Sequence, residues 1–272
     1  MKRIALVQMR SSEDKQENLK KSIDFIAEAA SRGAELVCFP EFQMAFSPGS
    51  QSAAELARIA ENVKGGDFVT GLAAAARKNR IGVVATIYEK SSKKSNRVYD
   101  TAVMLSPAGR VSAVYRKLHL YNALGFKESA KLIPGKEITR PAKTGAGSVG
   151  LLICYDLRFP ELSRILTVKG ADVLVAPSAW VAGEMKEEHW QTMVKARAIE
   201  NGSYVIAPDQ LGNIYCGRSM AVDPFGVVLV DMGQREGVEV IDIDKSRVQK
   251  VRQSLPLLKN RRTDVYKLSY YY

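Results

Sequence analysis

Short apolar runs alternate along the chain with longer segments whose apolar residues recur at helical spacing. The runs at 3–9, 34–40 and 81–89 are brief and bounded by polar residues, which is typical of buried strands. Residues 13–33 carry an amphipathic pattern that ends in a glycine, and this predicts a helix. Two further helices are expected at 52–62 and 67–79. The turn "PAG" between two strand-like runs then predicts a hairpin over 99–117.

The second half of the chain repeats this order of elements. Its predicted elements are strands at 149–154, 171–177 and 203–208, helices at 160–170 and 187–201, a hairpin around "DPFG", and a last strand at 238–244. The letters repeat as well, because "GAELVCFPEF" from Gly33 matches "GADVLVAPSA" from Gly170. We therefore interpret the chain as two similar βαβαββ halves.

Two such halves are expected to form two sheets with helices on their outer faces. The predicted fold class is α/β, and the predicted architecture is a four-layer α-β-β-α sandwich. A linker rich in Pro, Gly or Ser is absent between the halves, so we interpret residues 1–272 as a single domain.

Composition and charge then narrow the class of protein. Hydrophobic residues make up 46% of the chain and charged residues 25%, as in soluble globular proteins with a sizeable core. The N-terminal apolar run is too short for a signal peptide, and no segment approaches the roughly 18 apolar residues of a membrane span. The three widely spaced cysteines favour a reducing cytoplasm. The net charge of +11 is scattered, so we expect neither nucleic-acid nor membrane binding.

Several familiar kinds of site are missing from the sequence. It contains two histidines, His119 and His189, too few for a multi-histidine metal site, and no G-x-S-x-G motif. "GAGSVG" at 145–150 matches a dinucleotide-binding pattern in form. It is expected to follow a loop and precede a strand, whereas that pattern needs a helix after it. The sequence predicts neither a metal nor a cofactor.

Three polar residues stand where predicted strands end. Glu41 follows the run 34–40, Lys117 ends the second hairpin strand, and Cys154 ends the run 149–154. Strand ends of an α/β sandwich converge on one rim, where these groups would supply a base, an oxyanion stabiliser and a nucleophile. The alternative base is His119, which would make the protein a Cys–His hydrolase.

These residues lie in segments that resemble a known family. "FPEF" with Glu41, "YRKLHLY" with Lys117 and "ICYDLRFPEL" with Cys154 are similar, in this order, to the signature segments of the nitrilase, or carbon–nitrogen hydrolase, superfamily. The resemblance implies an α-β-β-α sandwich that is at least dimeric, and a Glu–Lys–Cys triad without metal or organic cofactor. It also implies a second glutamate before a Pro-Gly pair, which is Glu128 here.

Within the superfamily, "CYDLRFPELS", "PSAW" and "EEHW" look most like the amidase branch of deaminated glutathione amidase and omega-amidase. This implies hydrolysis of the C–N bond of a small carboxylate-bearing amide, of the deaminated glutathione or 2-oxoglutaramate type, with release of ammonia through a cysteine thioester. The chain has Tyr155-Asp156 where true nitrilases carry Trp-Glu. A nitrilase, an N-carbamoyl hydrolase and a non-catalytic binding protein of the same fold remain alternatives.

Further residues receive roles from their positions beside the triad. The backbone N–H of Tyr155 is expected at the oxyanion, and Arg158 at a substrate carboxylate unless it pairs with Asp156 or Glu161. Trp180 is expected at the substrate or in the core. Residues from about 250 to 272 resemble the family's C-terminal extension, which implies a place at the interface of a homodimer.

Overall fold

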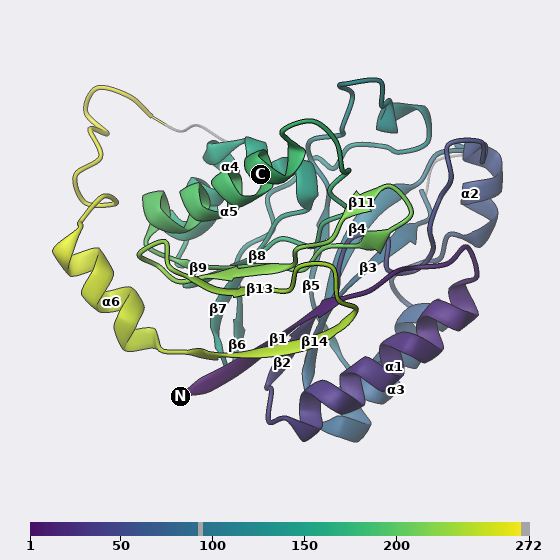
Figure 1. Cartoon of the computed structure of the whole chain (residues 1–272), viewed down its shortest axis with the longest axis horizontal. Helices are drawn as coiled ribbons and strands as arrows, with labels where there is room; N and C mark the ends of the chain where they lie inside the picture. The colour runs from purple at the N-terminus through teal and green to yellow at the C-terminus, as the bar shows by residue number, and fades with distance from the viewer. Residues whose placement is uncertain (92–94, 268–272) are drawn as a thin grey trace.

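The computed structural model describes residues 1–91 and 95–267, and two six-stranded sheets form its centre (Figure 1). The first part of the chain forms β1 (Lys2–Gln8), α1 (Lys15–Ser31), β2 (Leu36–Cys38), α2 (Ala53–Ile59), α3 (Asp67–Asn79), β3 (Gly82–Glu89), β4 (Tyr99–Leu105) and β5 (Val111–Arg116). A short 3-10 helix, η1 (Glu128–Ala130), follows. The elements from β1 to β5 agree with the predicted ones to within a few residues at each end, whereas η1 was not predicted.

The second part forms β6 (Ala142–Thr144), β7 (Gly147–Leu151), the 3-10 helix η2 (Cys154–Arg158), α4 (Pro160–Val168), β8 (Val173–Val175), α5 (Lys186–Asn201) and β9 (Tyr204–Ala207). It ends with β10 (Leu211–Gly212), β11 (Tyr215–Cys216), β12 (Met220–Val222), β13 (Val228–Asp231), β14 (Gly237–Ile243) and α6 (Lys245–Ser254). A loop was predicted before residue 145. This prediction was wrong in part, because β6 forms a hairpin with β7 there.

The two sheets share one topology, as the duplicated halves predict. In the first sheet, β1, β2 and β3 are parallel, β4 pairs antiparallel with β3, and β5 pairs antiparallel with β4. The second sheet has the same arrangement in β7, β8, β9, β12 and β13. The last strand takes the place beside β1 that β6 takes beside β7, antiparallel in both sheets, but β14 comes from the second half of the chain. β14 pairs antiparallel with β1 over its whole length, from Lys2↔Ile243 to Gln8↔Gly237. A strand of the second half therefore completes the first sheet.

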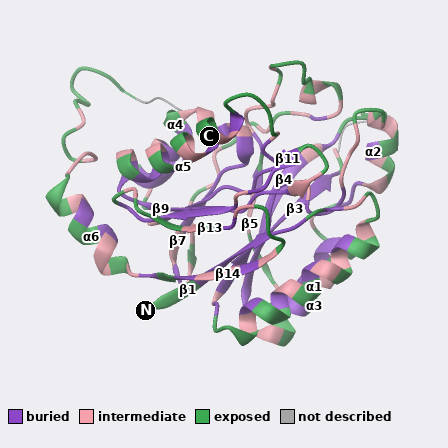
Figure 2. Cartoon of the chain, in the orientation of Figure 1, coloured by how far each residue is buried: buried purple, intermediate pink, exposed green. Residues whose placement is uncertain are grey.

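The side chains of each strand point alternately to the two faces of its sheet, and this alternation divides the core into layers. Ile4 and Leu6 of β1 lie in a cluster shared with the second sheet, whereas Ala5 and Val7 lie in another cluster with the helices α1 and α3. Successive side chains of a strand point to opposite faces, so a buried sheet contributes to both layers. The helices α4 and α5 cover the outer face of the second sheet, which completes the α-β-β-α sandwich (Figure 2).

The helices form because their buried positions fall on one side. In α1 the buried residues Asn18, Ser22, Ile26 and Ala29 recur at helical spacing, and Asp14 caps the first turn by accepting bonds from Gln16 and Glu17. α1 packs beside α3, and together they close the outer face of the first sheet. Because the helices cover the outer faces of the sheets, the ends of the strands form the rim that they leave uncovered.

Candidate active site

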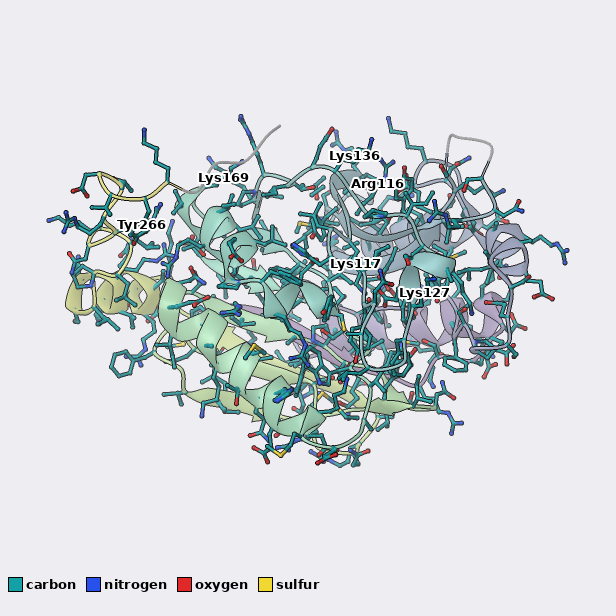
Figure 3. The ribbon with its side chains drawn as sticks, turned by 90° about the horizontal axis from the view of Figure 1, so that it is seen from above. Arg116, Lys117, Lys127, Lys136, Lys169 and Tyr266 are labelled. Carbon is teal, nitrogen blue, oxygen red and sulfur yellow. The ribbon has the colours of Figure 1, made fainter. Side chains whose placement is uncertain are left out.

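The three predicted site residues come from three strand ends. Glu41 lies just beyond β2, Lys117 directly follows β5, and Cys154 lies beyond β7. Strand periodicity turns neighbouring residues to opposite sides, so the Lys117 side chain is fully buried while that of Arg116 is 45% exposed (Figure 3). The fold therefore directs the Lys117 ammonium into the protein, toward Glu41.

Lys117 is surrounded by carboxylates. Its Nζ donates to Glu41 Oε1 at 2.6 Å and to Glu128 Oε1 at 2.9 Å, and it lies 3.9 Å from Asp100 Oδ2. Burial by itself lowers the pKa of Lys117, but the charges of Glu128 and Glu41 raise that pKa well above its ordinary value. The lysine is therefore a permanent cation in a site shielded from water.

Backbone groups fix the two glutamates in place. Glu41 Oε2 accepts the N–H of Ala179 at 2.8 Å, and Glu128 Oε2 accepts the N–H of Tyr121 at 2.7 Å. Burial raises the pKa of Glu128, while the neighbouring Lys117 lowers it. Each carboxylate thus has one oxygen on the lysine and the other on the backbone, which leaves little rotational freedom.

Cys154 occupies an unusual position of the backbone. The predicted strand 149–154 was wrong at its end: β7 stops at Leu151, and Cys154 begins η2 with a φ of 42°. This left-handed conformation costs a residue other than glycine about 1–3 kcal/mol. The Cys154 N–H donates to the carbonyl of Pro177 at 2.9 Å, which helps to hold the turn. The turn presents the thiol to a cavity rather than to the core.

The protonation state of Cys154 follows from its surroundings. Burial and the charge of Glu41 raise the pKa of the Cys154 thiol well above its ordinary value, although Lys117 opposes them. The thiol is therefore neutral at rest, and its use as a nucleophile requires a base that removes the proton. Glu41 and Lys117 are the charged groups that act most strongly on this sulfur.

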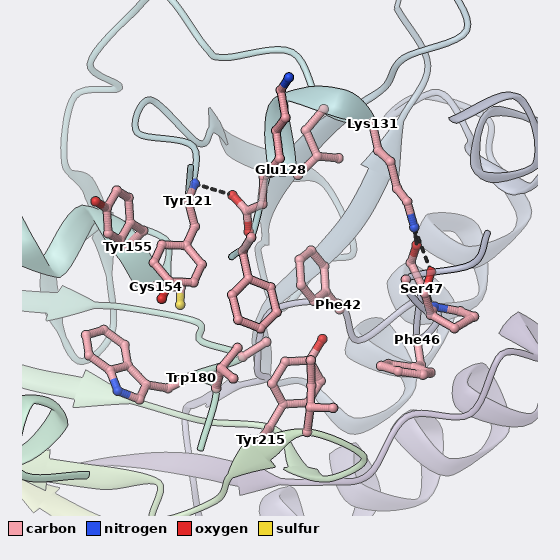
Figure 4. A pocket seen from close by; sticks show the side chains of 18 of the residues that line it. Phe42, Phe46, Ser47, Tyr121, Glu128, Lys131, Cys154, Tyr155, Trp180 and Tyr215 are labelled. Carbon is pink, nitrogen blue, oxygen red and sulfur yellow. Dashed lines mark hydrogen bonds between the residues drawn. The ribbon is translucent and has the colours of Figure 1, made fainter. Parts of the chain in front are cut away.

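The cavity beside Cys154 has a volume of about 680 Å³. Figure 4 shows Cys154, Tyr155 and Trp180 toward one side of it, and Ser47 and Lys131 toward the opposite side. The rings of Tyr155 and Tyr121 lie 4.9 Å apart. Because both Cys154 and Tyr155 belong to η2, the thiol and the backbone that follows it lie at this cavity.

Arg158 and Trp180 form part of the same wall. The Arg158 guanidinium carbon lies 4.6 Å from the centre of the Trp180 ring, and both residues line the cavity. Within residues 1–91 and 95–267, no carboxylate forms an ion pair with Arg158, so the pairing with Asp156 or Glu161 does not occur there. Trp180 is 4% exposed and donates its Nε1–H to the carbonyl of Lys186, so it is both core and cavity wall.

His119 lies in a different arrangement. Its Nδ1 contacts Asp156 Oδ1 at 2.7 Å, its ring stacks on Phe159 with centroids 3.7 Å apart, and it does not line the cavity. Asp156 also accepts the hydroxyl of Tyr115 at 2.6 Å. This geometry disfavours the Cys–His alternative, because the imidazole is turned toward Asp156.

Several residues of the site escaped the sequence analysis. Asp100 is an acid inside the apolar run of β4, and that contrast was a usable signal. Gln210 donates to the backbone oxygen of Glu41 at 2.9 Å, and Asp209 accepts the N–H of Trp180 at 2.7 Å. Both are fully buried polar residues beyond β9. Their contacts join segments far apart in sequence, which spacing alone does not reveal.

The described residues contain no cluster of three or more His, Cys, Asp or Glu arranged for a metal ion. In the same residues, no helix is long and apolar enough to cross a membrane.

A duplicated α-β-β-α sandwich with this thiol at its rim is the architecture of the nitrilase-like hydrolases. Residues 3–253 match the family model described as carbon-nitrogen hydrolase, and the chain belongs to this family. Deaminated glutathione amidase of Escherichia coli O157:H7 is 34% identical over 247 residues, which are 91% of this chain and 92% of that protein. The mouse protein of the same name is 37% identical over 278 residues, covering 97% and 84%.

Solved structures give the same result. The NitFhit protein of C. elegans superposes with a TM-score of 0.90 at 31% identity, covering 98% of this chain and 66% of that longer one. Nit3 of Saccharomyces cerevisiae, a member of branch 10 of the nitrilase superfamily, gives a TM-score of 0.85 at 31% identity, covering 96% of each chain. The fold prediction is confirmed, and the protein is an amidase that hydrolyses the amide bond of a small substrate.

Proposed function

We propose that Cys154 is the nucleophile of this amidase, Glu41 its general base and acid, and Lys117 its oxyanion stabiliser. The observation that carries the proposal is the buried Lys117 ammonium, 2.6 Å from Glu41 and 2.9 Å from Glu128, beside the end of the cavity that Cys154 lines. Such a cluster has no need to exist for folding alone, because buried charges are costly to desolvate.

The first half of the reaction forms a thioester. Glu41 accepts the thiol proton as Cys154 Sγ attacks the amide carbon, and the carbonyl π electrons move to oxygen. The negative charge thereby passes from Glu41 to the oxyanion, where Lys117 and the backbone N–H of Tyr155 stabilise it. One such donor is typically worth about 3–4 kcal/mol of barrier. Glu41 then gives its proton to the departing amine as the C–N bond breaks.

The second half releases the acid. Glu41, again a carboxylate, takes a proton from water while that water attacks the thioester, and the collapsing intermediate expels the Cys154 thiolate, which recovers the proton. Glu128 acts as a positioning residue in both halves, because it accepts a second hydrogen bond from the Lys117 ammonium, at 2.9 Å, and so holds Lys117 beside Glu41. The acyl part of the substrate is released as a carboxylic acid, whereas the identity of the leaving amine depends on the substrate.

The substrate is proposed to be an acyl amide with its own carboxylate, of the deaminated glutathione or 2-oxoglutaramate type. Arg158 supports this proposal, since a guanidinium on a cavity wall suits a carboxylate bidentately. Ammonia is the leaving group only for a primary amide such as 2-oxoglutaramate. In deaminated glutathione the amide nitrogen belongs to a dipeptide, which leaves as an amine.

We further propose a cytoplasmic homodimer in which each chain is one domain. All three cysteines are free and buried, as suits a reducing compartment. Val265 and Tyr266 are 68% and 53% exposed, so apolar surface near the end of the chain is available for a partner. The predicted extension from about 250 comprises the second half of α6 and the segment after it, except that 268–272 lie outside the described residues.

The function is tested with a panel of substrates. Wild type, Cys154→Ala and His119→Ala are assayed with 2-oxoglutaramate, deaminated glutathione, succinamate, a carbamoyl amino acid and an aliphatic nitrile. We expect amide hydrolysis by wild type and His119→Ala, and none by Cys154→Ala. Turnover of the nitrile or the carbamoyl compound alone would contradict the amide assignment, and selective loss in His119→Ala would favour the Cys–His mechanism.

A further inference from the structure

The cavity extends well beyond the thiol. Its volume of about 680 Å³ lies within the roughly 300–1,000 Å³ of sites for drug-sized ligands and exceeds the need of a five-carbon amide. Between the end near Cys154 and the opposite end near Lys131, the lining is largely apolar and includes Phe42 and Tyr215 (Figure 4). A substrate that fills the cavity is therefore longer than its acyl part.

Lys131 lies at the far end with only neutral partners. Its Nζ donates to Ser47 Oγ at 3.1 Å and to the carbonyl of Pro48 at 2.7 Å. In the described parts of the chain, no carboxylate lies within ion-pair distance of this ammonium. Burial lowers the pKa of Lys131, and the charge of Glu55 opposes this only in part. An ammonium has three donors, so one remains for a ligand after these two bonds.

The charges of the cavity are distributed unevenly. Its lining includes the cations Lys127, Lys131, Arg158 and Lys186 but a single described acid, Glu128. Glu128 is already bound to Lys117 and to the backbone of Tyr121. The cavity thus favours anions. One of its cations, Arg158, packs on Trp180 at the side of Cys154, and another, Lys131, lies at the opposite side.

We propose that Lys131, positioned by Ser47, binds a carboxylate on the leaving-amine side of the substrate, and that this contact selects N-substituted amides over primary amides. The inference rests on the proposed function, in which Arg158 takes the acyl carboxylate. With the amide carbon at Cys154 and the acyl carboxylate at Arg158, the chain beyond the amide nitrogen extends along the apolar section to Lys131. An amide with a carboxylate at each end, such as deaminated glutathione, fits this arrangement.

The two proposed substrates provide an internal control. Deaminated glutathione carries a carboxylate on its leaving dipeptide, whereas 2-oxoglutaramate has the same acyl group and only ammonia to lose. For Lys131→Met we expect KM for deaminated glutathione to rise about 10- to 100-fold with kcat little changed, as for the loss of one charged hydrogen bond. The kcat/KM for 2-oxoglutaramate should stay within about twofold, because that substrate ends before Lys131.

Matched variants distinguish the selective rise in KM for deaminated glutathione from a general loss of activity. Lys143→Met removes an exposed lysine of β6 that does not line the cavity, and should change neither substrate's kinetics. Lys131→Arg should retain most of the discrimination. Calorimetric binding to Cys154→Ala, with and without Lys131→Met, should show the same selective weakening for deaminated glutathione.

Each other outcome overturns the inference. An equal loss with both substrates in Lys131→Met would mean a structural role for the lysine, and no loss with either would mean that the far end binds nothing during turnover. Hydrolysis of neither substrate by wild type would instead overturn the proposed function and, with it, this subsite. The two failures are thus distinguished by the wild-type rates.

Discussion

Asp100 provides a quantitative test of the electrostatics around Lys117. Three carboxylates, those of Glu41, Glu128 and Asp100, lie within 3.9 Å of one ammonium, so full ionisation would leave two net negative charges in a buried site. Asp100 is the most distant of the three, and in the described structure its Oδ2 lacks a hydrogen-bond partner. Burial and the charge of Glu41 raise the pKa of Asp100 well above its ordinary value. We therefore expect Asp100 to be protonated in the folded protein.

The substitution Asp100→Asn converts this expectation into a pH dependence. A raised pKa means that the folded protein keeps a proton which the unfolded chain releases above pH about 4. The stability contributed by this proton is fully present below the unfolded pKa and is lost as pH rises through the folded pKa. The loss is up to about 1.4 kcal/mol per pH unit for one proton. Asparagine resembles the protonated acid in shape but does not titrate, so the variant lacks this loss.

Urea unfolding at pH 5, 6 and 7 measures the difference. Relative to wild type, the unfolding free energy of Asp100→Asn should increase with pH, by up to about 2.7 kcal/mol over these two units. The control is Asp223→Asn, since Asp223 is buried and pairs with Arg247 at 2.8 Å, and that variant should be destabilised. A pH-independent loss of stability in Asp100→Asn would refute the reasoning, because it would mean that an ionised Asp100 is needed.

Further predictions concern the site, a turn and the chain end. Lys117→Met should abolish activity and lower the unfolding free energy by about 3–5 kcal/mol, because it leaves buried carboxylates uncompensated. Urea titration measures this loss, with Lys143→Met as the control variant. Gly109→Ala should lower the melting temperature, since Gly109 has a φ of +70° and a Cβ there would lie 2.5 Å from the carbonyl oxygen of Ala73; an unchanged melting temperature would contradict it. Deleting the residues beyond 255 should reduce the mass found by light scattering, and an unchanged mass would argue against the proposed interface.

Much of the fold was predictable because its elements are local. The runs that became β1, β3 and β9 are apolar enough to be recognised alone, and the repeated order of strands and helices predicted two equivalent sheets. The pairing of β14 with β1 was not predictable, since periodicity marks a strand without indicating its neighbour. The helix α6 was missed because its charged sequence leaves only Val248 and Val251 buried.

The site was predictable where chemistry coincides with strand ends. Glu41 and Lys117 meet as expected, at 2.6 Å, because β2 and β5 end on the same rim. The turn at Cys154 was not foreseen, since a φ of 42° leaves no mark in an apolar run. The roles proposed for Asp100 and Lys131 depend on the groups that folding places around their side chains. Their roles became visible only once burial and partners were known.

In the proposed mechanism, Cys154 carries the acyl group during turnover. Rapid acid quenching of wild type during hydrolysis of 2-oxoglutaramate, followed by mass spectrometry of the peptide containing Cys154, tests it most directly. We expect an added acyl mass on this cysteine that appears and decays with turnover, and no turnover by Cys154→Ala. Hydrolysis by folded Cys154→Ala at a rate near that of wild type would contradict it.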